Sequence, residues 1–563
     1  MLKIEGLTVW ARYAKRWLQA NYNSGLDWSA RVGASEGKEK EPKNKRVLIA
    51  TSVAGHLTAL NVEAVVAKSL QVRGYKVDAL LCDSVLPACM DCQHSYFPTT
   101  LTRKYLLAYG PKALCVSCTT AGKKAYENLD IPVQLYSQYL HKEDLAKIEK
   151  LMSETAFGEI RQFQLDSISI GEHTYAGALR FFARGEISKE PMSEDIIKRY
   201  FRAALLAVFM TRNLLKNNAY DVCVLNHGIY VPQGLISEVC RASGVRVVTW
   251  NPAYRRGCFI FSHETTYHHT LMSEPTSVWE SMDWNDDIES DLMQYLHSRM
   301  EGTRDWISFH DKPEFDVGLI QSALNIDFSK PTIGLLTNVV WDAQLHYPAN
   351  SFKDMTEWIM ETIAWFASHP ELQLVIRVHP AEIRGSVPSR QRVVDEIEQA
   401  FSQLPSNVFV IGPESQYSTY AVMNQCDSVL IYGTKTGVEL TSIGVPVVVA
   451  GEAWIRGKGI TEDSSSKEGY FRILERLPYR ARLQDDRIRR ARMYAYHFFF
   501  RRMIPVSFMA ERKGWPSIEP IISNVVDLEE GKDLGLDIIC DGIGTGSPFV
   551  YPAEKLMTAR RAG

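Results

Sequence analysis

The chain has 563 residues, of which 45% are hydrophobic and 23% charged, and its 63 Lys and Arg against 66 Asp and Glu give a net charge of −3. This length exceeds one ordinary core and predicts two domains with attached segments, and the balanced charge gives no reason to expect a nucleic-acid partner. No apolar run long enough to span a bilayer and no secretory signal are found, and ten cysteines are too few for a disulfide scaffold of this size. We therefore expect a cytoplasmic protein with reduced thiols.

Residues 1–44 predict a short N-terminal helix followed by a polar linker. The helix, within residues 1–23, carries Trp10 and Trp17 among basic side chains such as Arg12 and Arg16. A basic helix with tryptophans can lie on a membrane surface, which would place the protein peripherally at the inner face of the cell membrane. The alternative is that the helix packs on the body of the protein.

Residues 45–275 predict a first Rossmann-like lobe, because apolar strands alternate with helical patterns at the rhythm of a parallel α/β sheet. Helices are predicted over 59–72 and 192–216. The predicted strands are Arg46–Thr51, Tyr75–Leu81, Ala113–Val116, Val133–Tyr136, Tyr220–Asn226 and Val245–Trp250.

A catalytic base is expected in this first lobe. His56 lies in the turn after the first strand, and a neutral imidazole near pH 7 suits deprotonation of an acceptor hydroxyl. Glu172, His173 and His227 are the other candidates, most of them better explained as structural. The prediction falls on His56.

Four cysteines of the first lobe form two Cys-x2-Cys pairs, Cys89 with Cys92 and Cys115 with Cys118. Two such pairs have the spacing of a tetrahedral zinc site, structural in kind because four thiolates leave no open position. An iron–sulfur cluster fits the same ligands, and Cys82 can substitute for one of them. The alternative is that Cys115 belongs to the core.

Residues 276–330 lack a clear period and predict a helical connection to a second lobe over residues 331–478. There an apolar strand (Thr332–Leu336) leads into the segment that ends at Asp342, and later strands cover Leu374–Val378 and Ser428–Tyr432. The carboxyl ends of parallel strands line one crevice, and ligands bind in that crevice. Asp342 is a candidate donor-binding residue on this ground.

His379 follows the second of these strands, and Pro380 ends the strand there. An imidazole in that place can donate a hydrogen bond to a phosphate or a leaving-group oxygen. Arg377 can add charge nearby, although strand alternation can also point it away. A second His-Pro pair, at His369, sits at a helix end, where proline is an ordinary stop signal.

The loop from Gly433 to Gly437 follows the third strand and precedes a helix over 438–443. Thr434, Lys435 and Thr436 are candidate phosphate-binding residues, with helix capping as the alternative for the two hydroxyls. Glu439 can accept hydrogen bonds from a ribose diol or complement the helix start.

The next loop carries Lys458, which can close on a diphosphate or lie on a solvated surface. Residues 479–563 predict a C-terminal helix, over 480–502, and a tail.

The order of these elements resembles the C-terminal lobe of a GT-B glycosyltransferase, and more narrowly the bacterial capsule polysaccharide biosynthesis family, which includes transferases for CMP-activated acidic sugars. The matching pieces are residues 338–342, 352–365, 377–382, 434–451 and 494–502. The resemblance implies that His379, Thr434 and Thr436 contact the donor phosphate. The loop reads Gly-Thr-Lys-Thr rather than paired serines, which leaves the donor base and sugar open.

The leading hypothesis is therefore a glycosyltransferase with two Rossmann-like lobes in a GT-B-like fold. It would move a sugar from a CMP-, UDP- or GDP-linked donor to a glycan or lipid-linked acceptor. Metal-independent transfer is expected, because no Asp-x-Asp motif falls at a strand end. The alternatives are a nucleotide-sugar epimerase of the same architecture and a metal-stabilised scaffold with a vestigial crevice.

Overall fold

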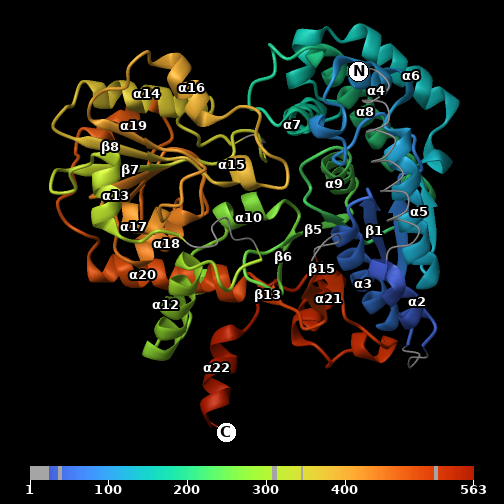
Figure 1. Ribbon diagram of the computed structural model, residues 1–563. Coiled ribbons are helices and arrows are strands. Elements are labelled where there is room, and N and C mark those ends of the chain that lie inside the picture. The colour runs from blue at the N-terminus through green and yellow to red at the C-terminus, as the bar shows by residue number, and fades with distance from the viewer. Residues whose placement is uncertain (1–23, 36–40, 307–312, 344–346, 513–517, 563) are drawn as a thin grey trace.

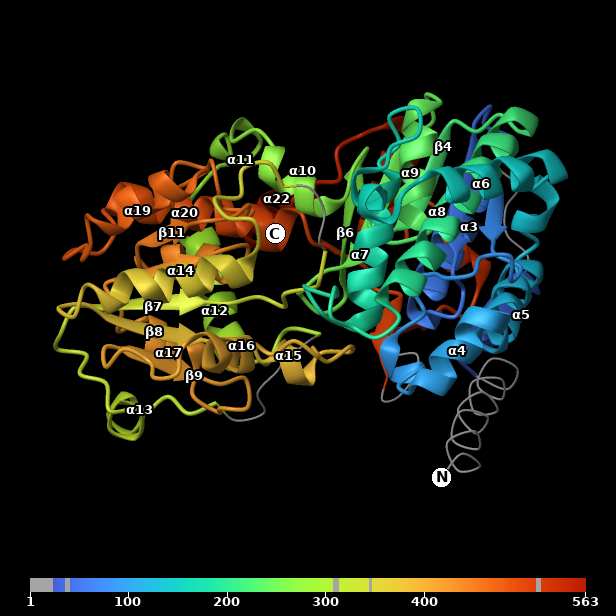
Figure 2. The ribbon, with the colours of Figure 1, turned by 90° about the horizontal axis from the view of Figure 1, so that it is seen from above.

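The computed structural model describes residues 24–35, 41–306, 313–343, 347–512 and 518–562, which form two α/β lobes side by side (Figures 1 and 2). Each lobe has a sheet that is parallel in its centre, with helices on both faces. This confirms the predicted GT-B-like arrangement of two Rossmann-like lobes. The N-terminal helix predicted within 1–23 lies outside the described residues.

The first sheet has seven strands in the order β13-β6-β5-β4-β1-β2-β3. Strands β1 to β5 run parallel, whereas β6 and β13 add antiparallel to one edge. Its strands are β1 (Arg46–Ser52), β2 (Lys76–Leu81), β3 (Val133–Leu135), β4 (Val222–Asn226), β5 (Arg246–Pro252), β6 (Cys258–His263) and β13 (Ile504–Pro505). The helices of this part are α2 (Asp27–Gly33), α3 (Leu57–Val72), α4 (Thr100–Tyr109), α5 (Lys112–Asn128), α6 (Lys142–Glu154), α7 (Ile170–Phe182), α8 (Ser193–Asn217) and α9 (Gln233–Ala242).

Strand β1 shows why both faces of this sheet are covered. Val47 and Ile49 join the core beneath α3, while Leu48 and Ala50 point into the core beneath α7 and α8. Successive side chains of a strand point to opposite faces, so a strand apolar at every position needs a helical layer on each side.

The predicted strand over 113–116 is wrong, because these residues belong to helix α5. A run of four apolar residues fits a short strand and a buried helical segment alike. The wider pattern decides for a helix, because Leu114, Ala121 and Ala125 are buried at spacings of seven and four residues.

The second sheet has six strands in the order β12-β11-β10-β7-β8-β9, all parallel. Its strands are β7 (Thr332–Leu336), β8 (Gln373–Arg377), β9 (Val408–Ile411), β10 (Ser428–Ile431), β11 (Val447–Val449) and β12 (Glu462–Asp463). The helices of this lobe are α14 (Met355–Ala367), α15 (Ala381–Arg384), α16 (Val393–Ala400), α17 (Thr419–Met423), α18 (Thr436–Ser442) and α19 (Lys467–Leu474).

The connection between the lobes is helical and packs on the second lobe. It contains α10 (Tyr267–Ser273), α11 (Ser277–Glu280), α12 (Asp286–Met300) and α13 (Val317–Leu324). Helix α12 shares a core with α18 and with α20 (Asp485–Tyr496), beneath one face of the second sheet. Helix α14 covers the opposite face.

The C-terminal tail returns to the first lobe. After α20 come a π-helix (His497–Arg501) and β13, which pairs with β6 of the first sheet. Helix α21 (Leu534–Thr545) then packs against α3, and α22 (Ala553–Ala562) projects from the body (Figure 1). A two-stranded pair, β14 (Met509–Glu511) with β15 (Ile518–Pro520), lies between β13 and α21 in the chain.

Candidate functional site

A cavity of about 440 Å³ lies between the two lobes, and we call it the interlobe cavity. From the second lobe it is lined mainly by residues that follow strands, namely 336–340, 342, 343, 379–381 and 432–436. From the first lobe and the connection it is lined by His227, Tyr254, Tyr267, His268 and residues around Arg299. In open α/β sheets the ligand crevice lies outside the carboxyl ends of the strands, at the point where strand order reverses. In the two sheets that point falls between β1 and β4 and between β7 and β10.

His379 lies at the end of β8, on the wall of the interlobe cavity. Its backbone N–H donates to Oγ1 of Thr337 at 3.0 Å, which fixes the loop to the end of β7. Its Nδ1 accepts from the N–H of Ala381 at 3.1 Å. In a neutral imidazole with Nδ1 as an acceptor, Nε2 carries the proton. The ring is therefore set to donate a hydrogen bond through Nε2.

The loop at the start of α18 also lines the cavity, with Thr434, Lys435 and Thr436. Oγ1 of Thr434 accepts from the N–H of Thr436 at 3.4 Å and lies 3.3 Å from the hydroxyl of Thr436. The hydroxyls thus order the helix start and lie beside the cavity, so capping and phosphate binding are compatible. A Cβ at Gly433 would stand 3.3 Å from the carbonyl oxygen of Glu452, which leaves little room for a side chain there.

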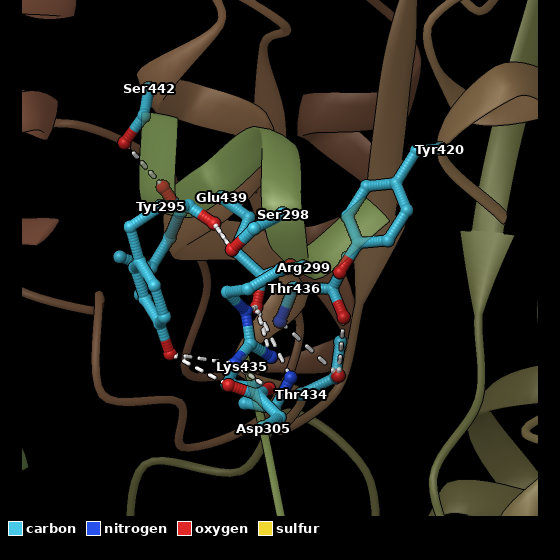
Figure 3. A network of polar contacts seen from close by, with 11 residues as sticks. Tyr295, Ser298, Arg299, Asp305, Tyr420, Thr434, Lys435, Thr436, Glu439 and Ser442 are labelled. Carbon is cyan, nitrogen blue, oxygen red and sulfur yellow. Dashed lines mark hydrogen bonds and ion pairs between the residues drawn. The ribbon is translucent and has the colours of Figure 1, made fainter. Parts of the chain in front are cut away.

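A network of charged groups lies behind this loop (Figure 3). Arg299 is ion-paired with Asp305 and with Glu439 at 3.1 Å, and Lys435 Nζ contacts the same carboxylate at 3.1 Å. The hydroxyl of Tyr420 donates to the other oxygen of Glu439. Two cations and two carboxylates therefore balance in a buried cluster that fixes the direction of Lys435.

Glu439 belongs to this network and is not among the residues that line the cavity. Its side chain is 2% exposed, and both of its oxygens already accept hydrogen bonds. Burial alone would raise its pKa, but the charges of Arg299 and Lys435 and the Tyr420 hydroxyl outweigh burial and lower the pKa of Glu439 to about 2. The predicted contact of Glu439 with a donor ribose is thus replaced by a role in holding two cations.

Arg377 and Lys458, both predicted to bind the donor, have guanidinium and ammonium groups that bind backbone carbonyls. Arg377 is 1% exposed and donates to the carbonyls of Gly412 and Ser415. Lys458 Nζ donates to the carbonyls of Met272 and Glu274, at 3.1 and 2.9 Å, and lies outside the cavity wall. Lys458 thus holds the end of α10, whereas Arg377 holds the loop after β9 and also lines the cavity.

Asp342 lines the cavity and joins the two lobes. The hydroxyl of Tyr230, from the first lobe, donates to its Oδ1 at 2.6 Å and accepts from the N–H of Ala343 at 3.0 Å. A second contact joins the two lobes. Oε1 of Gln391, in the second lobe, accepts from the N–H groups of Gly185 and Glu186 in the first lobe, both at 2.9 Å.

His56 caps helix α3, with Nδ1 accepting from the N–H of Ala59 at 3.2 Å. It follows β1 as predicted but is not among the residues that line the cavity. Burial lowers its pKa, while Asp91 opposes and Arg180 adds to that change. The Nδ1 atom of His56 is thus already engaged in capping the start of α3.

The structure does not bring Cys89, Cys92, Cys115 and Cys118 into a metal-binding arrangement. Within the part of the chain that the structure describes, no three His, Cys, Asp or Glu side chains are grouped to hold a metal ion. Cys115 and Cys118 lie in the continuous helix α5 rather than in a turn that presents two thiolates to one ion. Sγ of Cys118 accepts from the N–H of Gly55 at 3.1 Å, and burial raises the pKa of Cys118 well above its ordinary value.

Several cavity residues were not predicted from the sequence. Asn338 follows β7, and its buried Oδ1 has no hydrogen-bond partner among the described residues. Its position just after a strand could have identified Asn338 from the sequence as a cavity residue. Arg299 and Asp305 come from the connection, where no sequence pattern marked them, and Tyr254, His268 and Tyr420 belong to loops or short helices.

Over the described residues, no helix is both long and apolar enough to cross a membrane.

Residues 323–488 match the model of a family described as capsule polysaccharide biosynthesis protein. This confirms the resemblance seen in the sequence, and it covers the second lobe. No curated protein sequence matches the chain.

Three solved structures illustrate the structural likenesses. The beta Kdo 2,4 transferase KpsC of Thermosulfurimonas dismutans has 14% identity and a TM-score of 0.32, over 49% of this chain and 79% of that one. A sucrose-phosphate synthase from Thermosynechococcus elongatus has 12% identity and a TM-score of 0.27, over 81% and 95%. The UDP-GlcNAc 2-epimerase of Neisseria meningitidis, bound to UDP-GlcNAc, has 13% identity and a TM-score of 0.27, over 79% and 97%. The two-lobed fold rests on the topology of the two sheets.

Proposed function

We propose that this protein, whose second lobe matches the model of a family described as capsule polysaccharide biosynthesis protein, is a glycosyltransferase of bacterial surface polysaccharide assembly. The second lobe binds a nucleotide-sugar donor, and the first lobe holds a glycan or lipid-linked acceptor. The observation that carries the proposal is the interlobe cavity, where the carboxyl ends of both sheets meet and where His379 and the Thr434–Thr436 loop stand together.

The donor half of the reaction needs groups that stabilise a departing phosphate. His379 donates through Nε2, and the hydroxyls of Thr434 and Thr436 offer further hydrogen bonds. Lys435 brings a positive charge to the same wall. Its Nζ is held by Glu439 and lies over the Tyr254 ring, 4.7 Å from the ring centroid. Donors aimed at developing negative charge in a partly closed site lower the barrier to its formation.

Isothermal titration with CMP, UDP, GDP and CDP identifies the donor nucleotide, and turnover of the matching nucleotide sugars then tests the reaction. We expect one nucleotide to bind clearly more tightly than the others, and an acceptor glycoside and free nucleotide to form together. Interconversion of free nucleotide sugars without acceptor would instead indicate an epimerase, and absence of nucleotide binding would indicate a scaffold.

A peripheral membrane contact through residues 1–23 is part of the proposal, supported by the tryptophans and basic residues of that segment. Deleting these residues should reduce cosedimentation with vesicles that contain anionic lipid. Equal cosedimentation of the full and shortened chains would show that residues 1–23 do not make the membrane contact.

A further inference from the structure

We infer that His227 is the base that deprotonates the acceptor hydroxyl, and that Asp342 from the opposite lobe stabilises the charge His227 acquires. The base is therefore complete only where the two lobes meet. This inference rests on the proposed glycosyl transfer and assigns its acceptor half, for which the sequence had predicted His56.

The position of His227 is the first support. It follows β4 directly, at the point where strand order reverses in the first sheet, and it lines the interlobe cavity. Its φ of 68° lies in the left-handed region, and its backbone N–H donates to the carbonyl of Trp250 at 3.0 Å. Non-glycine residues in this conformation are uncommon and concentrate at functional sites.

The imidazole of His227 is not used by the fold. The rings of His173 and His497 are both hydrogen-bonded to glutamates, and that of His56 caps a helix. The Nδ1 atom of His227 is buried and has no hydrogen-bond partner among the described residues. Buried polar atoms are nearly always paired, and an unpaired one in a cavity wall indicates a ligand that supplies the partner.

The charges around His227 come from several elements. Burial lowers the pKa of His227 to about 4, Asp342 opposes this change, and Arg180 on α7 and His56 after β1 add to it. His268 on α10 lies with its ring centroid 6.4 Å away, and burial lowers its pKa to about 3. All three histidines have lowered pKa values, so the ring of His227 is neutral at pH 7 and can accept a proton.

Asp342 is a positioning residue in this scheme. Tyr230, 2% exposed, lies with its ring centroid 5.2 Å from that of His227 and donates to Asp342 at 2.6 Å. The carboxylate is thereby held across the lobe boundary, in reach of an imidazolium charge.

The acceptor O–H gives its proton to a ring nitrogen of His227, and the oxygen forms a bond to the anomeric carbon. The bond from that carbon to the donor phosphate oxygen breaks, and its electron pair leaves with the phosphate, which accepts a hydrogen bond from His379. The imidazolium then returns its proton to solvent.

The test uses His227→Gln, which keeps a polar side chain but cannot take up a proton at neutral pH. We expect kcat to fall by roughly 10²- to 10⁴-fold, the range of general-base catalysis, with donor Kd unchanged. Retained donor binding shows that the variant is folded. The remote His369→Gln serves as the control and should keep wild-type kcat.

A pH profile separates the base from its positioning residue. For the wild type, the acid limb of kcat/KM should lie below the ordinary His value of 6.5, because burial lowers the pKa of His227 to about 4. Asp342→Asn should move that limb to lower pH and reduce kcat, and Tyr230→Phe should do the same to a smaller extent. Wild-type kcat in His227→Gln, or a loss confined to His56→Gln, would overturn the inference. A wild type that binds no nucleotide and transfers no sugar would instead overturn the proposed function.

Discussion

Two His-Pro pairs in the second lobe differ in what holds the imidazole. At His379 the Nδ1 atom accepts from the N–H of Ala381, so the proton sits on Nε2. At His369 the Nδ1 atom lies 2.7 Å from the carbonyl of Trp365 and carries the proton itself, while the ring stacks on Trp365 at 3.6 Å. The same dipeptide therefore gives a cavity donor in one place and a helix end in the other.

This contrast provides a matched pair of variants. His379→Ala should lower kcat/KM for transfer by roughly 10- to 100-fold, because a hydrogen bond to a charged phosphate contributes about 1.5–3 kcal/mol. His369→Ala, with the same chemical change outside the cavity, should leave kcat/KM near the wild-type value. Equal kcat/KM in the two variants would remove His379 from the mechanism.

Glu439→Gln tests the buried network. A carboxyl group whose pKa falls from 4.5 to about 2 on folding stabilises the folded state above pH 4.5, and this stability is lost as pH falls toward 2. Removing the charge should cost about 3 kcal/mol at pH 7 and flatten the dependence of unfolding free energy on pH between 4.5 and 2. Donor affinity should also fall, because Lys435 loses its partner.

Glu468→Gln is the control for this variant. Glu468 also lies in the first turn of a helix, α19, but is exposed. Its loss should cost only about 0.3–1 kcal/mol, the contribution of charge at a helix start. A similar small loss in Glu439→Gln would mean that Glu439 merely complements its helix.

For individual residues, the sequence predicted a place in the cavity better at strand ends than elsewhere. His379 and Thr434 follow strands, so their place in the cavity could be predicted. Lys458 could not be distinguished from a cation at the cavity wall, because its carbonyl partners, Met272 and Glu274, lie in a distant part of the chain. Asp305, in the connection, had no pattern to mark it.

Among the elements, long periodic segments were predicted best. The helix expected over 192–216 is α8, Ser193–Asn217, and the strand expected over 332–336 is β7 with the same bounds. The short apolar run at 113–116 was misread, because four residues are too few to show a period. Strand β13 was missed, since its pairing with β6 across more than 200 residues leaves no local signal.

The docking of α21 on the first lobe depends on small residues. A Cβ at Gly544 would stand 1.9 Å from the hydroxyl oxygen of Tyr75. Arg246 donates to the carbonyl of Gly542 at 2.9 Å, and Lys45 to that of Gly544 at 2.8 Å, so the helix cannot easily move away.

Gly544→Ala should therefore destabilise the protein by about 1–3 kcal/mol, the usual cost of an overpacked contact, and lower the calorimetric Tm. Gly158→Ala is the matched control, because a Cβ there meets no atom within 4 Å. Equal Tm values for the two variants would show that α21 is not held at this contact.

In the whole molecule, the candidate site lies between the two lobes rather than within one of them. Tyr230 and Asp342, and Gly185 and Gln391, join residues that lie more than 100 positions apart in the chain. The sequence predicted each lobe from its own alternation of strands and helices, but which residues face one another across the boundary is set by lobe packing. The contact of Tyr230 with Asp342 across this boundary could be seen only in the structure.

The most direct measurement of the central claim is a crystal structure of the protein with the nucleotide that binds most tightly in titration. The account predicts the nucleotide in the interlobe cavity, with a phosphate oxygen about 2.7–3.2 Å from Nε2 of His379 and from a hydroxyl of the Thr434–Thr436 loop. The reacting side of the phosphate should face His227 and Asp342. A nucleotide bound outside this cavity, or one whose phosphates contact neither His379 nor the loop, would contradict the account.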